Sequence, residues 1–143
     1  MPFFKSIVCG VDDSPQSLLA LRAAAQLARE SSAKLTLLHA EAPPRGEALF
    51  APPAPFVPAS AAPPDEERWC ELASSISGRP VELHYATGDA GAQLVTFAQE
   101  GKCDLVVLGS RARNAAALAL GSVVPKVLLH APCAVLVIPS PRN

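Results

Sequence analysis

The sequence lacks an excess of charge of either sign. Its 143 residues carry 12 Lys and Arg against 13 Asp and Glu, which gives a formal net charge of -1 at pH 7. Proteins that bind nucleic acids or anionic membranes usually present a strongly basic surface. We therefore expect neither a nucleic acid nor a membrane among the partners of this protein.

Long, unbroken apolar segments are also missing. The first 14 residues contain no extended apolar stretch followed by small residues, as a secretion signal would. The apolar stretch at residues 115–138 is interrupted by Pro125, Lys126, His130 and Pro132, whereas a membrane helix needs about 20 consecutive apolar residues. These absences predict a soluble protein of the cytoplasm.

The cysteines and histidines lack the spacing of metal and redox motifs. No two cysteines form a Cys-x-x-Cys pair, and the histidines do not cluster with them. We predict reduced, mostly buried thiols and no metal site. The residues concerned are Cys9, Cys70, Cys103, Cys133, His39, His84 and His130.

Recognisable catalytic motifs are absent as well. The sequence contains neither the Walker A pattern of phosphate-transferring enzymes nor a Gly-x-Ser-x-Gly nucleophile elbow. No Ser-His-Asp or Cys-His set can be assembled from it. We expect a protein that is not an enzyme, with at most a weak ATPase or autophosphorylation activity if nucleotide binds.

Half of the residues are hydrophobic, which suffices for one packed domain. Five short apolar segments have the pattern of buried strands, and amphipathic segments lie between them. The predicted strands are 6–11, 34–40, 81–86, 104–109 and 134–138, and the predicted helices are 15–31, 65–77, 90–100 and 122–130. This alternation predicts a single α/β domain with a doubly wound parallel sheet.

Residues 42–64 interrupt the alternation. They carry eight of the 15 prolines of the chain, with many alanines and no polar/apolar period. Proline-rich chain favours extended backbone without internal hydrogen bonds. We predict an irregular loop between the second strand and the second helix.

Two junctions at the carboxyl ends of predicted strands have unusual chemistry. The segment GVDDS (10–14) ends the first strand, and GSRARN (109–114) ends the fourth. Open parallel sheets bind ligands beyond these ends, where the winding of the chain reverses. Glycine N–H groups and a helix N-terminus at Gly121-Ser122 would suit a phosphate. The side chains that would add to a nucleotide site are Arg111 and Arg113 for the phosphates and Asp12 for the ribose hydroxyls.

These features also have purely structural interpretations. An acidic pair such as Asp12-Asp13 stabilises a following helix through the helix dipole. Ser122 would serve as an N-cap with or without a ligand, and Arg111 and Arg113 would suit a solvated loop. The residues alone leave both interpretations open.

Other α/β proteins fit the chain less well. A phospho-accepting receiver domain requires a third aspartate after the third strand and a lysine after the fifth, where this chain has Thr87-Gly88 and Pro139. A flavodoxin-like FMN carrier requires a phosphate loop after the first strand, where Asp12-Asp13 would repel phosphate. The glycine-rich loop of an adenylating ligase is absent from the same place.

Along nearly its whole length the chain resembles a universal stress protein (UspA-like) domain. The matching segments, in the family's order, are IVCGVDDS (7–14), LTLLH (35–39), Gly88-Asp89, DLVVLGSR (104–111), GSV (121–123) and VLLHAPCAVLVI (127–138). The resemblance implies a five-stranded sheet of strand order 3-2-1-4-5, as in adenine nucleotide α-hydrolase-like folds. It also implies a role in the stress response and a homodimer paired through strand 134–138.

Some members of this family bind ATP through a motif written G-x2-G-x9-G-[ST]. Carried over by position, the nucleotide-binding residues are Asp12 at the ribose, Ala40 at the adenine through its backbone, and Gly109, Arg111, Gly121, Ser122 and Val123 along the phosphates. The implied ligand is ATP or AMP, with Mg2+ only if ATP binds.

The chain departs from that motif at three points. Ala112 replaces the second glycine, only eight residues separate it from Gly121, and Pro125 has no N–H to offer in the first turn of the last helix. Two functions remain open. One is a nucleotide-sensing module that binds ATP or AMP and alters how the dimer meets protein partners. The other is a nucleotide-free interaction module in which the shortened loop has closed the site.

Overall fold

The computed structural model describes residues 3–12, 14–41, 65–110 and 123–139. Within them, five parallel strands form one sheet of order β3-β2-β1-β4-β5, the order that the resemblance implies. The strands are β1 (Ser6–Gly10), β2 (Lys34–Glu41), β3 (Glu82–Thr87), β4 (Leu105–Gly109) and β5 (Ala134–Ile138), and the helices are α1 (Pro15–Ser31), α2 (Glu66–Ser77), α3 (Ala90–Glu100) and α5 (Val123–His130).

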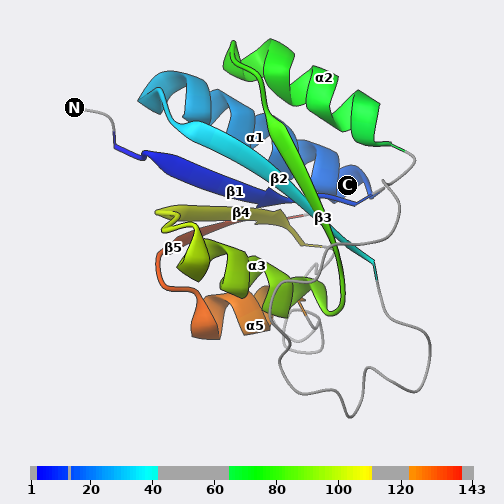
Figure 1. Ribbon diagram of the computed structural model, residues 1–143, viewed down its shortest axis with the longest axis vertical. Helices are drawn as coiled ribbons and strands as arrows, with labels where there is room; N and C mark the ends of the chain where they lie inside the picture. Colours follow the sequence, from blue (N-terminus) through cyan, green and yellow to red (C-terminus); the bar gives the residue numbers. More distant parts are fainter. Residues whose placement is uncertain (1–2, 13, 42–64, 111–122, 140–143) are drawn as a thin grey trace.

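Helices cover both faces of the sheet (Figure 1). α1 and α2 pack on one face, over a core that includes Leu37 and Trp69. α3 and α5 lie on the other face, over a core that includes Leu38 and Leu94. Neighbouring residues of β2 thus belong to different cores, because side chains alternate along a strand. The result is the predicted doubly wound α/β domain.

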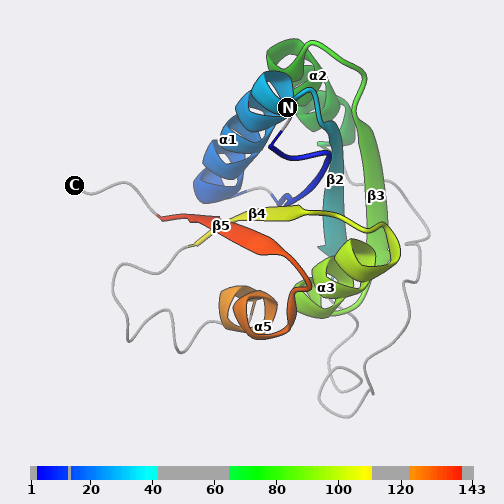
Figure 2. The same cartoon turned by 90° about the vertical axis from the view of Figure 1, so that its left-hand side faces the viewer.

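The winding of the chain reverses between β1 and β4, which pair directly from Ile7↔Leu105 to Cys9↔Val107. β2 and β3 lie on one side of β1, and β4 and β5 lie on the other. Figure 2 shows β5 and β3 at the two edges of the sheet. In such a sheet the ligand region lies at the carboxyl ends of β1 and β4.

Helix α1 begins and ends where the sequence predicts. Ser14 is its N-cap, and the Ser14 hydroxyl accepts a hydrogen bond from the N–H of Ser17 at 3.2 Å. Pro15 occupies the first helical position, where a missing N–H has no cost. Ser32 then closes the helix in the left-handed conformation, with φ of 55°.

Strand boundaries differ from the prediction by one residue. β1 ends at Gly10 instead of Val11, β2 extends to residue 41, and β3 covers 82–87 instead of 81–86. β4 begins at Leu105 instead of Asp104; the Asp104 carboxylate accepts hydrogen bonds from the backbone N–H groups of Lys5 and Ser6 at 2.8 and 3.1 Å. The apolar pattern does not show such a contact between distant residues.

All four cysteines are free thiols. Cys9 and Cys103 are buried, as predicted, whereas Cys70 and Cys133 are half-buried. Burial raises the pKa of the Cys9 thiol to about 12. In the described ranges no group of three or more His, Cys, Asp and Glu residues is placed to hold a metal ion, and none of the helices there combines the length and apolarity needed to cross a membrane.

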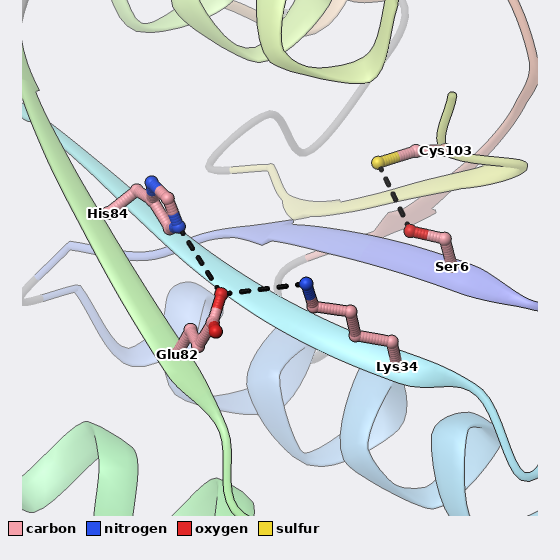
Figure 3. A network of polar contacts seen from close by, with 5 residues as sticks. All are labelled: Ser6, Lys34, Glu82, His84 and Cys103. Carbon is pink, nitrogen blue, oxygen red and sulfur yellow. Dashed lines mark hydrogen bonds and ion pairs between the residues drawn. The ribbon is translucent and has the colours of Figure 1, made fainter. Parts of the chain in front are cut away.

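Polar side chains meet near the amino-terminal ends of the strands (Figure 3). Lys34 Nζ and His84 Nε2 lie 3.6 and 3.5 Å from Glu82 Oε2, and the Ser6 hydroxyl donates to Cys103 Sγ at 3.6 Å. Exposed ion pairs of this kind contribute little to stability. Because Ser6, Lys34 and Glu82 each begin a strand, this cluster lies at the opposite end of the sheet from the candidate ligand region.

Candidate functional site

Asp12 lies directly beyond the end of β1, and two hydrogen bonds fix its position. Its backbone N–H donates to the Ser17 hydroxyl at 2.7 Å, and its Oδ1 accepts from the N–H of Ser14 at 2.7 Å. Ser17 is buried, whereas Asp12 is exposed. One carboxylate oxygen therefore supports the start of α1, while the side chain as a whole remains accessible to a ligand.

His39 and Trp69 support the same segment from the other side. His39 Nδ1 lies 2.9 Å from the carbonyl oxygen of Val11, and since a carbonyl can only accept, this nitrogen carries the hydrogen. The His39 ring packs against buried Trp69 of α2, with ring centroids 5.2 Å apart. β2, α1 and α2 together hold the residues that precede Asp12. Sequence reasoning gave His39 no role.

Ala40 lies near the carboxyl end of β2 and pairs in register with Ala86 of β3. The N–H of Val11 donates to the carbonyl of Leu38, which therefore points toward β1. Backbone groups of alternate residues along a strand point to the same side, so the N–H and C=O of Ala40 also point toward β1. The pairing of β1 with β2 ends at Gly10↔Leu38. The backbone of Ala40 thus faces the region beyond the end of β1.

Gly109 ends β4 and lies against the first turn of α1. A Cβ at this position would lie 2.5 Å from the carbonyl oxygen of Gln16, so no larger residue fits without a shift of the backbone. The next residue, Ser110, donates its N–H to the carbonyl of Ile138 in β5 at 2.8 Å. Packing alone therefore explains the glycine that the family motif assigns to phosphate.

Val123 is the first residue of α5 and Pro125 is the third, so this proline lies in the first turn of the helix, as the sequence predicts. α5 lies close to α3, because a Cβ on Gly91 would lie 3.3 Å from the carbonyl oxygen of Val123. The contact fixes the beginning of α5 against the beginning of α3.

An ion pair reinforces the contact of the two helices. Asp89 is the N-cap of α3, and its Oδ2 accepts from the N–H of Ala92 at 2.9 Å. The same oxygen lies 2.9 Å from Nζ of Lys126 in α5. The carboxylate of Asp89 is therefore engaged within the protein.

The topology brings four predicted site residues to one edge of the sheet, at the carboxyl ends of the strands: Asp12, Ala40, Gly109 and Val123. We call this edge the switch-point edge. The other predicted site residues, Arg111, Arg113, Gly121 and Ser122, lie outside the described residues, as do Asp13, Ala112 and the proline-rich segment 42–64.

Gln93 belongs to the same edge, although sequence reasoning did not select it. It lies in the first turn of α3, the residue is 1% exposed, and its Oε1 has no hydrogen-bond partner in the described part of the chain. The apolar pattern of this helix includes Phe97, four residues later, so Gln93 lies on the inner face. That spacing was the available signal for its burial.

A comparison with models of protein families matches residues 3–139 to the universal stress protein family. This chain belongs to that family. A comparison with curated proteins gave no match. The family that the sequence resembles is thus confirmed over nearly the whole chain.

Solved structures of other universal stress proteins share the fold. One, determined in complex with cAMP, superposes with a TM-score of 0.72 at 27% identity, over 94% of this chain and 96% of that chain. UspA from Lactobacillus plantarum gives 0.63 at 23% identity, over 94% and 97%. A protein from Archaeoglobus fulgidus in complex with dAMP gives 0.62 at 22% identity, over 96% and 99%. The universal stress protein fold therefore accounts for the arrangement of the switch-point edge.

Proposed function

We propose that this universal stress protein binds an adenine nucleotide, ATP or AMP, at the switch-point edge and serves as a nucleotide-sensing module in the stress response. The observation that carries the proposal is the position of Asp12, an exposed carboxylate at the point where the winding reverses. Its hydrogen bonds with Ser14 and Ser17 hold it in place before any ligand arrives. Two neighbouring ribose hydroxyls are suitable donors to such a carboxylate.

The backbone of Ala40 supplies the complement to adenine. Its N–H and C=O point to the region beyond the end of β1, because they lie on the same side of β2 as the Leu38 carbonyl that accepts from the N–H of Val11. Adenine carries an amino donor next to a ring-nitrogen acceptor, which matches one backbone acceptor and one backbone donor. The relative of 27% identity that was solved with cAMP supports an adenine nucleotide as the ligand class.

The phosphates would lie between the end of β4 and the beginning of α5. Gly109 ends β4 and Val123 begins α5, and the other residues assigned to the phosphates are Arg111, Arg113, Gly121 and Ser122. A helix N-terminus favours an anion through its free N–H groups and its dipole, although Pro125 removes one of these N–H groups. Mg2+ enters the proposal only with ATP, and we propose at most a weak ATPase or autophosphorylation activity.

The regulatory part of the proposal concerns the dimer. We propose that two copies pair through β5 in the cytoplasm and that bound nucleotide alters how the dimer meets protein partners. β5 lies at the edge of the sheet, and an apolar edge strand is suited to pairing with a second copy.

Isothermal titration calorimetry with ATP and AMP tests the proposal. We expect micromolar binding by the wild-type protein and at least about tenfold weaker binding by Asp12→Ala, since a hydrogen bond to a charged group contributes about 1.5–3 kcal/mol. Glu71→Ala, at an exposed position of α2, is the matched control and should bind like the wild type. Equal binding by Asp12→Ala would contradict the assignment of Asp12.

The second candidate function is a nucleotide-free interaction module. It is favoured by two adjacent exposed leucines of α5, Leu128 at 51% and Leu129 at 79% exposure, because apolar surface of this kind is suited to contact with another protein. Absence of binding at millimolar nucleotide would favour this function over nucleotide sensing.

A further inference from the structure

We propose that Gln93 selects the base of the bound nucleotide by accepting a hydrogen bond from the 6-amino group of a purine. The inference rests on the nucleotide site proposed above and assigns to that site a recognition residue beyond the family motif. The observation that carries it is a buried acceptor, Gln93 Oε1, that has no partner in the described residues although the residue is only 1% exposed. Such acceptors are rare in native proteins, because burial without a partner is destabilising.

The position of the amide places this acceptor beside the proposed base site. A Cβ built on Gly88 would lie 3.1 Å from Gln93 Nε2 and 3.8 Å from Cγ and Cδ, with Oε1 farther away. Gly88 directly follows β3, and its N–H donates to the carbonyl of Glu41 at the end of β2. The Gln93 amide therefore lies at the carboxyl ends of β2 and β3, with Nε2 as its atom nearest to Gly88.

Small residues surround this end of the sheet. Ala40 packs against the core beneath α3, and its register partner Ala86 shares that face of the sheet and is fully buried. Gly88 has φ of 136°, a backbone conformation that residues other than glycine rarely adopt. On the other side, Leu94 follows Gln93 and reaches Gly10, where a Cβ would lie 3.1 Å from Leu94 Cδ1. The Gln93 amide thus lies between the ends of β3 and β1, on the face of the sheet against which Ala40 of β2 packs.

The chemistry favours a 6-aminopurine. An amino group carries two hydrogens, so the carbonyl of Ala40 can accept one and Gln93 Oε1 the other. A purine with a carbonyl at position 6 would place its oxygen against the Ala40 carbonyl and Gln93 Oε1. All three are hydrogen-bond acceptors, so this purine should bind less well. The Gln93 oxygen is covered by protein atoms, so the base would reach it through a local opening of the edge. Binding would then give the buried oxygen the partner that it lacks among the described residues.

The test compares AMP with purine riboside 5′-monophosphate, which lacks only the 6-amino group. Titration calorimetry measures both ligands on the full-length wild type, on Gln93→Met and on Gln26→Met. Met has nearly the shape of Gln without its acceptor, and Gln26 is an exposed residue of α1 that serves as the matched control. We expect the wild type and Gln26→Met to prefer AMP, and Gln93→Met to reduce that preference about tenfold, the effect of one hydrogen bond to a buried group.

The outcomes distinguish a failure of the inference about Gln93 from a failure of the proposed function. If the wild type binds both ligands equally, nucleotide binding stands and the role of Gln93 is overturned. If Gln93→Met weakens both ligands by the same factor, Gln93 acts in packing and the inference is wrong. If neither ligand binds the wild type at millimolar concentration, the proposed function fails and the inference fails with it. Thermal unfolding adds a check that does not depend on ligand: the melting temperature of Gln93→Met should not fall, because the variant removes a buried oxygen that has no partner in the described part of the chain.

Discussion

The carbonyl oxygen of Gln16, in the first turn of α1, lies so close to Gly109 that a Cβ on the glycine would be 2.5 Å away. Two parts of the switch-point edge, the end of β4 and the beginning of α1, are therefore in direct backbone contact. A glycine at this position is required by the fold whether or not phosphate binds. Loss of nucleotide binding on its substitution would not by itself identify a phosphate contact.

Gly109→Ala should lower the free energy of unfolding by about 1–3 kcal/mol, the usual cost of forcing extra atoms into a packed site. Urea unfolding monitored by circular dichroism measures the change. Gly10→Ala is the matched control, because the nearest atom there, 3.1 Å away, is the end of the flexible Leu94 side chain and can move. Equal losses in the two variants would contradict the close contact with Gln16.

Ser14→Ala should cost about 1 kcal/mol of stability, since it removes the N-cap hydroxyl that accepts from Ser17. Ser14→Thr keeps a capping hydroxyl and should lose less. Urea unfolding of both variants provides the measurement. If threonine is as destabilising as alanine, the capping hydrogen bond is not the source of the effect.

Cys9 should make the protein less stable at alkaline pH. Burial raises the pKa of its thiol from the ordinary 9.0 to about 12, so above pH 9 the unfolded chain loses the proton while the folded protein keeps it. The contribution of this thiol to the free energy of unfolding is complete below pH 9. It is lost between pH 9 and 12, at up to about 1.4 kcal/mol per pH unit. Urea unfolding of the wild type and Cys9→Ala between pH 8 and 10.5 tests this: the variant should show the shallower decline, and parallel profiles would argue against the shift.

Substitution of the β5 edge should give monomers. The side chains of Leu136 and Val137 are half-buried in the single chain, and a lysine at either position would bring a charge into the proposed dimer contact. Light scattering coupled to size exclusion measures the mass, with circular dichroism to verify folding. Leu129→Lys, on the exposed face of α5, should remain a dimer. An unchanged mass of folded Leu136→Lys and Val137→Lys would overturn the assignment of β5.

Local sequence signals predicted the elements but not the contacts between distant residues. The Ser14-Pro15 pair located the start of α1 because an N-cap and a first-turn proline act on their own helix. Asp104 was different: its partners, Lys5 and Ser6, are almost 100 residues away in the sequence, so the apolar pattern placed it inside a strand. Long-range contacts of this kind require the folded sheet.

The same distinction applies to the site. Asp12 was predicted from its place after the first strand and Ala40 by the family resemblance, and both lie at the switch-point edge. Gln93 was not selected, although its spacing from Phe97 places it on the inner face of α3, because a polar side chain does not count toward an apolar stripe. The need for glycine at position 109 likewise comes from the position of α1 in the folded protein, which the family motif does not show.

The close approach of α3 and α5 at Gly91 determines one further property of the site. Gln93 lies on the first of these helices and Val123 begins the second, and the Asp89–Lys126 pair joins them beside the same glycine. The spacing between the base end and the phosphate end of the proposed site is therefore set by a contact between two helices. A larger residue at Gly91 would push the helices apart and change the length of ligand that the protein accepts, without altering any group that touches the ligand.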